Sequence, residues 1–159
     1  MADGVVRAAP GRHTRRIELE SLRRVSLAAL IMLVVQYGLG TVLNLYIAIP
    51  ASDARAGIMQ EIVNGPAMLT LHALLGLALI GAALLLLVRA VRLEDRVIAV
   101  LAAAGLTAIG GAFASGEIFV LNGQSGASLA MALLTGVALL CYIGALVQVG
   151  TALRRRSTG

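Results

Sequence analysis

The sequence is poor in charge and in the motifs that mark enzymes. Only 13% of its 159 residues are charged and 59% are hydrophobic, whereas a soluble domain is about 25% charged. Its single cysteine, Cys141, excludes an intrachain disulfide and a thiol-based metal cluster. No nucleophile elbow, phosphate-binding loop, zinc motif or dinucleotide fingerprint occurs. These absences favour a non-enzymatic protein and leave any catalytic activity without a supporting motif.

Histidine is scarce and lysine is absent. The only histidines are His13, in the polar N-terminal tail, and His72, so haem held between two intramembrane histidines is excluded. Haem bound by one histidine and one methionine stays open. All 13 basic residues are arginine, which we attribute to a GC-rich genome. The net charge of +5 does not indicate nucleic acid binding, because the arginines flank apolar runs, where membrane orientation explains them.

Four long apolar runs dominate the chain, each near the roughly 20 residues that cross a bilayer. They cover about residues 26–49, 67–88, 97–121 and 127–153. Short connections join them, and no stretch remains for a separate soluble domain. The sequence therefore predicts an all-α fold, a bundle of four transmembrane helices.

The arginines predict the orientation of this bundle. Six lie in the tail, residues 1–25, three in the second loop and three in the end, residues 154–159. The first and third loops hold one and none. Because arginine collects on the cytoplasmic side of membrane proteins, we expect both termini in the cytoplasm of a bacterium and a multi-pass protein in its cytoplasmic membrane. The basic tail also suits anionic lipid headgroups.

A cleaved signal peptide is the competing interpretation of the first apolar run, with a cleavage site at Ala54-Arg55-Ala56. The run is far longer than the roughly 7–15 apolar residues of a signal peptide, so we interpret it as a span. Residues 17–25 suit a short juxtamembrane helix. Residues 51–65 are expected to form an amphipathic helix on the membrane surface.

The third apolar run, with its continuation to Asn122, is rich in small residues. Two stripes at four-residue spacing run along it: Ala104, Ala108, Ala112 and Gly116, and beside them Ala103, Thr107, Gly111 and Ser115. Small residues at this spacing let helix backbones approach closely in a membrane. We therefore expect this span at the packed centre of the bundle, with a second copy of the chain as another possible partner for the stripes.

Several polar residues share one depth near the outer ends of the predicted spans. They are Asn44, Thr70, His72, Glu117, Asn122 and Ser128. From a helix rise of about 1.5 Å per residue, His72 lies roughly 9 Å and Glu117 roughly 6 Å below the outer surface. Polar groups inside a bilayer are costly and need a partner or a purpose. On the first span, helical spacing also marks an inward face, made of Tyr37, Gly40, Thr41, Asn44 and Ala48.

His72 and Glu117 are the leading candidates for a functional pair. Together they could relay protons, hold a cation or bind a polar headgroup. Two structural interpretations compete with this one: the pair fixes helix register by a hydrogen bond, or Glu117 extends to water at the interface.

A metal site was also considered at this depth. Met68 and His72 lie four residues apart on one helix face, and with Glu117 and Met131 they could supply ligands suited to copper. Methionine at helical spacing is more often packing. No cofactor is therefore expected, with haem or copper as the open alternative.

The segments LNLYIAIP and NGPAMLTLHALLGL and the run from Gly116 to Met131 resemble a family of small four-helix membrane proteins of actinobacteria. This resemblance implies the four-span fold and no particular activity. Four-helix haem proteins such as the cytochrome b561 type, or one half of haem A synthase, are similar in architecture. This chain departs from them in lacking paired intramembrane histidines, so their activity is not carried over.

The expected function is binding of a partner, a lipid or a small ligand at the polar layer of the outer leaflet. A proton- or cation-coupled transporter that uses His72 and Glu117 is the alternative, and a haem- or copper-binding redox protein is the third. The lipid bilayer is the expected surrounding, and a second copy or another membrane protein is a possible partner.

Overall fold

The computed structural model describes residues 12–46, 66–122 and 124–157, and these residues form four long helices. The helices are α1 (Arg12–Tyr46), α3 (Ala67–Arg92), α4 (Arg96–Asn122) and α5 (Ser125–Ser157). No strand occurs in these ranges. Each helix is long and apolar enough to cross a membrane. The prediction of an all-α chain with four helices of membrane-spanning length is confirmed.

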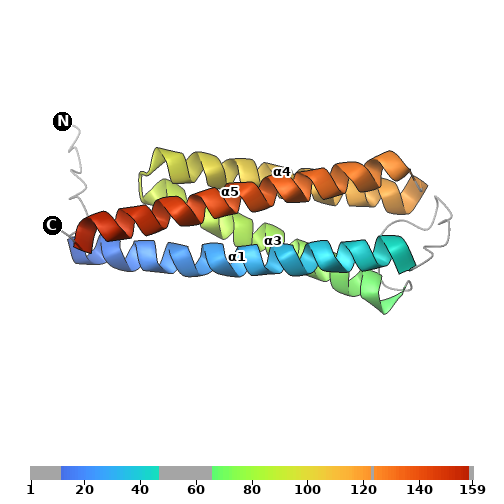
Figure 1. The fold of residues 1–159 in the computed structure, drawn as a ribbon, viewed down its shortest axis with the longest axis horizontal. Helices are drawn as coiled ribbons and strands as arrows, with labels where there is room; N and C mark the ends of the chain where they lie inside the picture. Colours follow the sequence, from blue (N-terminus) through green and yellow to red (C-terminus); the bar gives the residue numbers. More distant parts are fainter. Residues whose placement is uncertain (1–11, 47–65, 123, 158–159) are drawn as a thin grey trace, which may run out of the picture.

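The four helices form a ring in which each packs against its neighbours along the chain (Figure 1). The last helix, α5, closes the ring against α1. Within the described residues no close backbone approach joins α1 to α4 or α3 to α5, so these pairs lie across the ring from each other. The start of α1, the end of α5 and the turn between α3 and α4 lie at one end of the bundle.

The first helix begins at Arg12, well before the predicted start near residue 26. The physical reason is a buried stripe that continues from the apolar run into the charged segment. Leu19 and Leu22 are buried at helical spacing with Ser26, and their exposed neighbours carry the charges. The juxtamembrane segment is therefore continuous with the span. The surface helix expected at residues 51–65, and Ala48, lie outside the described residues.

Large side chains fill the centre of the bundle in the half nearest the chain ends. Those without exposed surface include Leu22, Leu86, Ile98, Tyr142 and Val149. The outward faces are also apolar, since Leu77, Val100 and Leu140 are at least 60% exposed. An apolar exterior over an apolar core is the pattern of a helix bundle that sits in lipid rather than in water.

The small residues of α4 face α5, and α4 is not at the centre of the bundle. An added Cβ at Gly105 would lie 2.9 Å from Cζ of Tyr142, and one at Gly111 would lie 3.1 Å from Cδ1 of Leu134. Ala103, Ala104 and Thr107, by contrast, are exposed. The predicted stripes were therefore wrong only at their start, since Ala108 is buried and Gly111 and Gly116 lie against side chains of α5. Close approach between α4 and α5 depends on the glycines.

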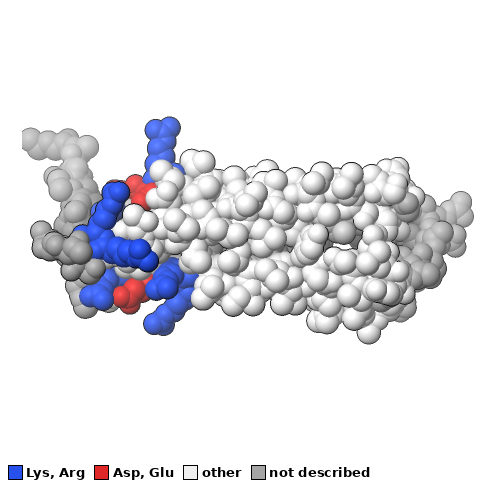
Figure 2. Space-filling view, viewed as in Figure 1, with Lys and Arg blue, Asp and Glu red and all other residues white. Residues whose placement is uncertain are grey.

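Charged side chains gather at the end where α1 begins, and the described surface visible along the rest of the bundle is uncharged (Figure 2). Arg15 donates to the carbonyl oxygen of Leu93 and Arg89 donates to Ser21, so both arginines tie α1 to the C-terminal end of α3. Asp95 caps α4, because its carboxylate accepts from the first backbone N–H groups of that helix. Among described side chains, Glu117 is the one charged group outside this end.

Candidate functional site

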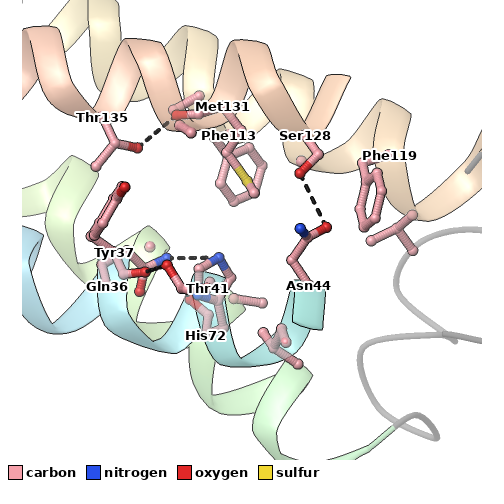
Figure 3. Close-up of a pocket in the computed structure, with 18 of the residues that line it drawn as sticks. Gln36, Tyr37, Thr41, Asn44, His72, Phe113, Phe119, Ser128, Met131 and Thr135 are labelled. Carbon is pink, nitrogen blue, oxygen red and sulfur yellow. Dashed lines mark hydrogen bonds between the residues drawn. The ribbon is translucent and has the colours of Figure 1, made fainter. Parts of the chain in front are cut away.

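A cavity of about 330 Å³ lies between the four helices, in the half of the bundle away from the charged end (Figure 3). All four helices line it. Its polar lining residues are Gln36, Tyr37, Thr41, Asn44, His72, Glu117, Ser128 and Thr135. Small residues such as Gly40, Gly76 and Ala112 stand where the other half of the bundle has large side chains. The centre is therefore left unfilled here.

The central polar contact of the cavity joins α1 to α3. The side-chain amide of Gln36 donates from Nε2 to the backbone carbonyl oxygen of His72 at 3.0 Å, and the same nitrogen lies 3.2 Å from Nε2 of the imidazole. A carbonyl oxygen can only accept, which fixes the amide nitrogen on this side. The second amide hydrogen is then directed to the imidazole, and this arrangement places the imidazole proton on Nδ1.

Two glycines make room for this pair in a reciprocal way. An added Cβ at Gly40 would lie 3.2 Å from Cε1 of His72, and one at Gly76 would lie 3.1 Å from Nε2 of Gln36. On each helix the glycine follows the polar residue by four positions, one helical turn. Each polar side chain thus lies against the glycine of the opposite helix, which positions both side chains at the cavity wall.

The same pair has unused hydrogen-bonding capacity. Oε1 of Gln36 and Nδ1 of His72 are buried and have no hydrogen-bond partner. A buried polar atom without a partner costs about 1–3 kcal/mol. The wall of the cavity therefore holds one acceptor and one donor that a small rearrangement would make available to a bound molecule.

A second polar contact joins α1 to α5, farther from the charged end of the bundle. Ser128 on α5 donates from Oγ to Oδ1 of Asn44 on α1 at 3.1 Å. In Figure 3, Tyr37 points from α1 toward Thr135 of α5. The hydroxyl of Thr135 donates to the carbonyl oxygen of Met131 on its own helix at 2.8 Å. Around the cavity, the hydrogen bonds between helices thus lie at the Gln36–His72 and Asn44–Ser128 levels.

Glu117 contributes the one carboxylate of the cavity lining. The structure gives it no hydrogen bond and no ion pair among the described residues. Two aromatic residues of the same helix, Phe113 and Phe119, line the cavity with it. Phe113 is 40% exposed and its ring reaches toward α3, since an added Cβ at Gly76 would lie 3.8 Å from its Cδ2. Among the described residues, no cation lines the cavity together with this carboxylate.

The structure brings together four of the five predicted site residues: Asn44, His72, Glu117 and Ser128 all line the cavity. Asn122 is exposed and does not line it. The predicted inward face of the first span also lines the cavity over its described part, residues 37–44. The recorded hydrogen-bond partner of His72 is Gln36 and not Glu117, so the proposed functional pair shares a cavity without a direct contact.

The four residues considered for a metal are divided by the fold. His72, Glu117 and Met131 line the cavity, whereas Met68 does not. The thioether of Met131 packs over Gly116, where an added Cβ would lie 3.3 Å from its sulfur. No group of three histidine, cysteine, aspartate or glutamate side chains within metal-binding reach occurs in the described part of the chain. Three of the four residues of the predicted copper set thus share one cavity, and Met68 lies outside its lining.

Sequence reasoning missed several cavity residues as site residues, among them Phe113, Phe119 and Thr135, and the most central one is Gln36. It carried a usable signal, since an amide within an apolar run needs a partner. Grouping polar residues by depth below the outer surface placed Gln36 near the middle of its span, outside the layer. Its side chain nevertheless reaches the backbone of His72.

Comparison with known proteins adds no constraint on this site. No protein-family model matches the chain, and no curated protein or solved structure matches it significantly. The chemistry of the cavity is therefore argued from its own geometry.

Proposed function

We propose that this protein is a non-enzymatic binding protein of the membrane, whose cavity takes a small and mainly apolar ligand. The observation that carries the proposal is a cavity of about 330 Å³ with an apolar lining and a few convergent polar groups. Small-molecule sites are of this kind, concave and mostly apolar, with volumes of about 300–1,000 Å³. The polar groups would orient the ligand and the apolar walls would supply most of the affinity.

The proposed setting is a bacterial cytoplasmic membrane with both ends of the chain in the cytoplasm. The arginines support this orientation, since they gather at the end of the bundle where α1 begins and α5 ends. The cavity would then lie in the outer half of the bilayer. A ligand would reach it from the outer aqueous phase or from the outer leaflet.

A transporter coupled to protons or cations is the second candidate. One observation favours it: His72 and Glu117 line the same cavity. Apart from tyrosine and cysteine, they are the two ionisable side chains in the described parts of the apolar runs. Transport also needs a path to the cytoplasmic side, which here is filled by buried side chains such as Leu33, Leu86 and Tyr142. Flux of the ligand through proteoliposomes, measured on wild type and Glu117→Gln, separates transport from binding alone.

The binding function is tested by filling the cavity. Ala112 lines it, whereas Ala114, two positions along the same helix, is exposed. The probe is neopentylbenzene, a neutral and compact apolar molecule, added to the protein in detergent. The readout is the midpoint of thermal unfolding, followed by circular dichroism. A ligand that binds the folded state raises this midpoint, and the added stability grows with the logarithm of one plus the ratio of ligand concentration to dissociation constant.

We expect neopentylbenzene to stabilise the wild type and Ala114→Leu but not Ala112→Leu. The leucine side chain at position 112 would occupy ligand space, while at position 114 it would lie on the outer face. Equal stabilisation of all three proteins would assign the effect to the detergent phase. No stabilisation of the wild type would reject this cavity as an apolar binding site.

A further inference from the structure

We infer that the ligand of this cavity is a lipophilic organic cation, a compact apolar body that carries one positive charge such as a quaternary ammonium. This inference rests on the proposed binding function and names the ligand class. Three features of the cavity carry it: one carboxylate, aromatic residues in the lining and no cationic side chain of the described residues nearby.

The first feature is the charge of the cavity. Glu117 is the one charged side chain of the lining, and it has no hydrogen bond or ion pair among the described residues. Every arginine whose side chain is described belongs to the opposite end of the bundle. A carboxylate in an apolar setting is stabilised by an opposite charge nearby, and the described residues supply none at this cavity. A bound cation would supply it.

The second feature is the aromatic content of a chain that has few aromatic residues. Aromatic residues make up 3% of the sequence, and three of the five, Tyr37, Phe113 and Phe119, line this cavity. The faces of aromatic rings attract cations, and quaternary ammonium groups are recognised in this way. Tyr37 comes from α1 and the two phenylalanines from α4, so aromatic groups approach from across the ring.

The third feature argues for an organic cation over a metal ion. Hard metal ions take about six to eight oxygen ligands and are commonly held by several carboxylates, whereas the cavity offers a single carboxylate, the amides of Gln36 and Asn44, and four hydroxyl groups. Three of these hydroxyls already donate hydrogen bonds within the protein. Most of the lining is apolar, formed by residues such as Leu33, Leu79 and Ile109. Such walls suit a charge that is carried on an apolar body and that needs little hydration.

The test compares two molecules of the same shape that differ in one charge. Benzyltrimethylammonium is the cation, and neopentylbenzene is its carbon isostere, in which carbon replaces nitrogen. Binding of each is measured on the full chain in lipid nanodiscs by isothermal titration calorimetry, with empty nanodiscs as the blank. Glu117→Gln removes the charge of the cavity. Glu94→Gln removes one carboxylate at the opposite end of the bundle and is the matched control.

We expect the wild type and Glu94→Gln to bind the cation at least about tenfold more tightly than the isostere, which corresponds to a cation–π and charge contribution of modest size. Glu117→Gln should lose this preference and keep the affinity for the isostere. Substituting Phe113→Leu should weaken binding of the cation more than binding of the isostere.

The other possible results contradict either the inferred charge of the ligand, the role of Glu117 or the proposed binding function. If the isostere binds and the cation binds no better, the cavity is an apolar site without charge selectivity and the inference fails, while the proposed function stands. If neither molecule binds, both fail. A preference for the cation that survives in Glu117→Gln would remove Glu117 from the site. Because the wild-type comparison needs no variant, misfolding of Glu117→Gln leaves the inference testable.

Discussion

At the scale of single residues, Tyr142 has an unusual environment. Its side chain is fully buried, and its ring lies against Gly105 of α4, where an added Cβ would come within 2.9 Å. Its hydroxyl oxygen is buried without a hydrogen-bond partner. Polar groups in this state reduce stability, since they lose water and gain nothing in return. The ring therefore packs the α4–α5 contact while its hydroxyl opposes it.

Replacing the hydroxyl should consequently stabilise the protein. We expect Tyr142→Phe to raise the free energy of unfolding by about 1–3 kcal/mol, the cost of an unsatisfied buried group. The measurement is equilibrium unfolding in mixed micelles, followed by helix content. Tyr37→Phe is the control, because Tyr37 is 49% exposed and its hydroxyl should contribute little. A loss of stability in Tyr142→Phe would mean that the hydroxyl has a partner, such as a bound water.

The types of the residues were enough to predict several polar side chains of the cavity. They were not enough to predict which of these side chains contact each other. Asn44, His72, Glu117 and Ser128 were identified because polar groups in apolar runs are rare and their depth follows from helix rise. The partner of His72 was not predictable in this way. A helix turns about 100° per residue, so partners depend on rotation and tilt, which the positions of polar residues alone do not fix. The structure pairs His72 with Gln36.

At the scale of helices, the contact between α1 and α3 depends on small residues at chosen positions. Gly76 lies under the amide of Gln36, where an added Cβ would come within 3.1 Å of Nε2. Gly81, on the same helix, has nothing within 4 Å of an added Cβ. Replacing each glycine by alanine therefore separates the effect of side-chain packing on stability from the effect of helix propensity.

We expect Gly76→Ala to destabilise the bundle by about 1–3 kcal/mol, the usual cost of an extra methyl group in a packed contact. Gly81→Ala should be neutral or stabilising by up to about 1 kcal/mol, because alanine favours helix over glycine. Thermal unfolding of both variants beside the wild type is the measurement. Equal shifts in the two variants would show that the amide moves aside at no cost and that the contact is loose.

The helix ends were predictable to different degrees. For α3, α4 and α5, apolar runs bounded by charged or turn residues set the ends to within a few residues. For α1, a short juxtamembrane helix was expected at residues 17–25, and the structure continues it without a break from Arg12 into the span. The continuity follows from Leu19 and Leu22, which extend the buried face with a helical period into the charged segment.

At the scale of the whole molecule, the cavity follows from where side-chain volume is distributed along the ring. Near the charged end, large side chains such as Leu22, Ile98 and Tyr142 fill the centre. In the other half, glycine and alanine occupy several inward positions. The sequence predicted four helices and a polar layer in that half. It did not predict a cavity, because which small residues face inward depends on how the helices are rotated.

The position of the cavity in the membrane follows from orientation, which the arginines predict. Twelve of the 13 arginines belong to the tail, the second loop and the C-terminal end, and such segments stay in the cytoplasm. We expect a green fluorescent protein fused after Gly159 to be fluorescent, because it folds in the cytoplasm. Alkaline phosphatase inserted after Gln124, in the turn between α4 and α5, should be active, because it folds outside.

The reverse fusions provide the control: phosphatase after Gly159 should be inactive and fluorescent protein after Gln124 dark, with both chains present at equal amounts. The opposite pattern would place the charged end outside and the cavity in the inner leaflet. In that case Glu117 would face the cytoplasm, and a membrane-impermeant cation added to intact cells could not reach it. With the predicted orientation, the same cation should reach the cavity from outside without crossing the membrane.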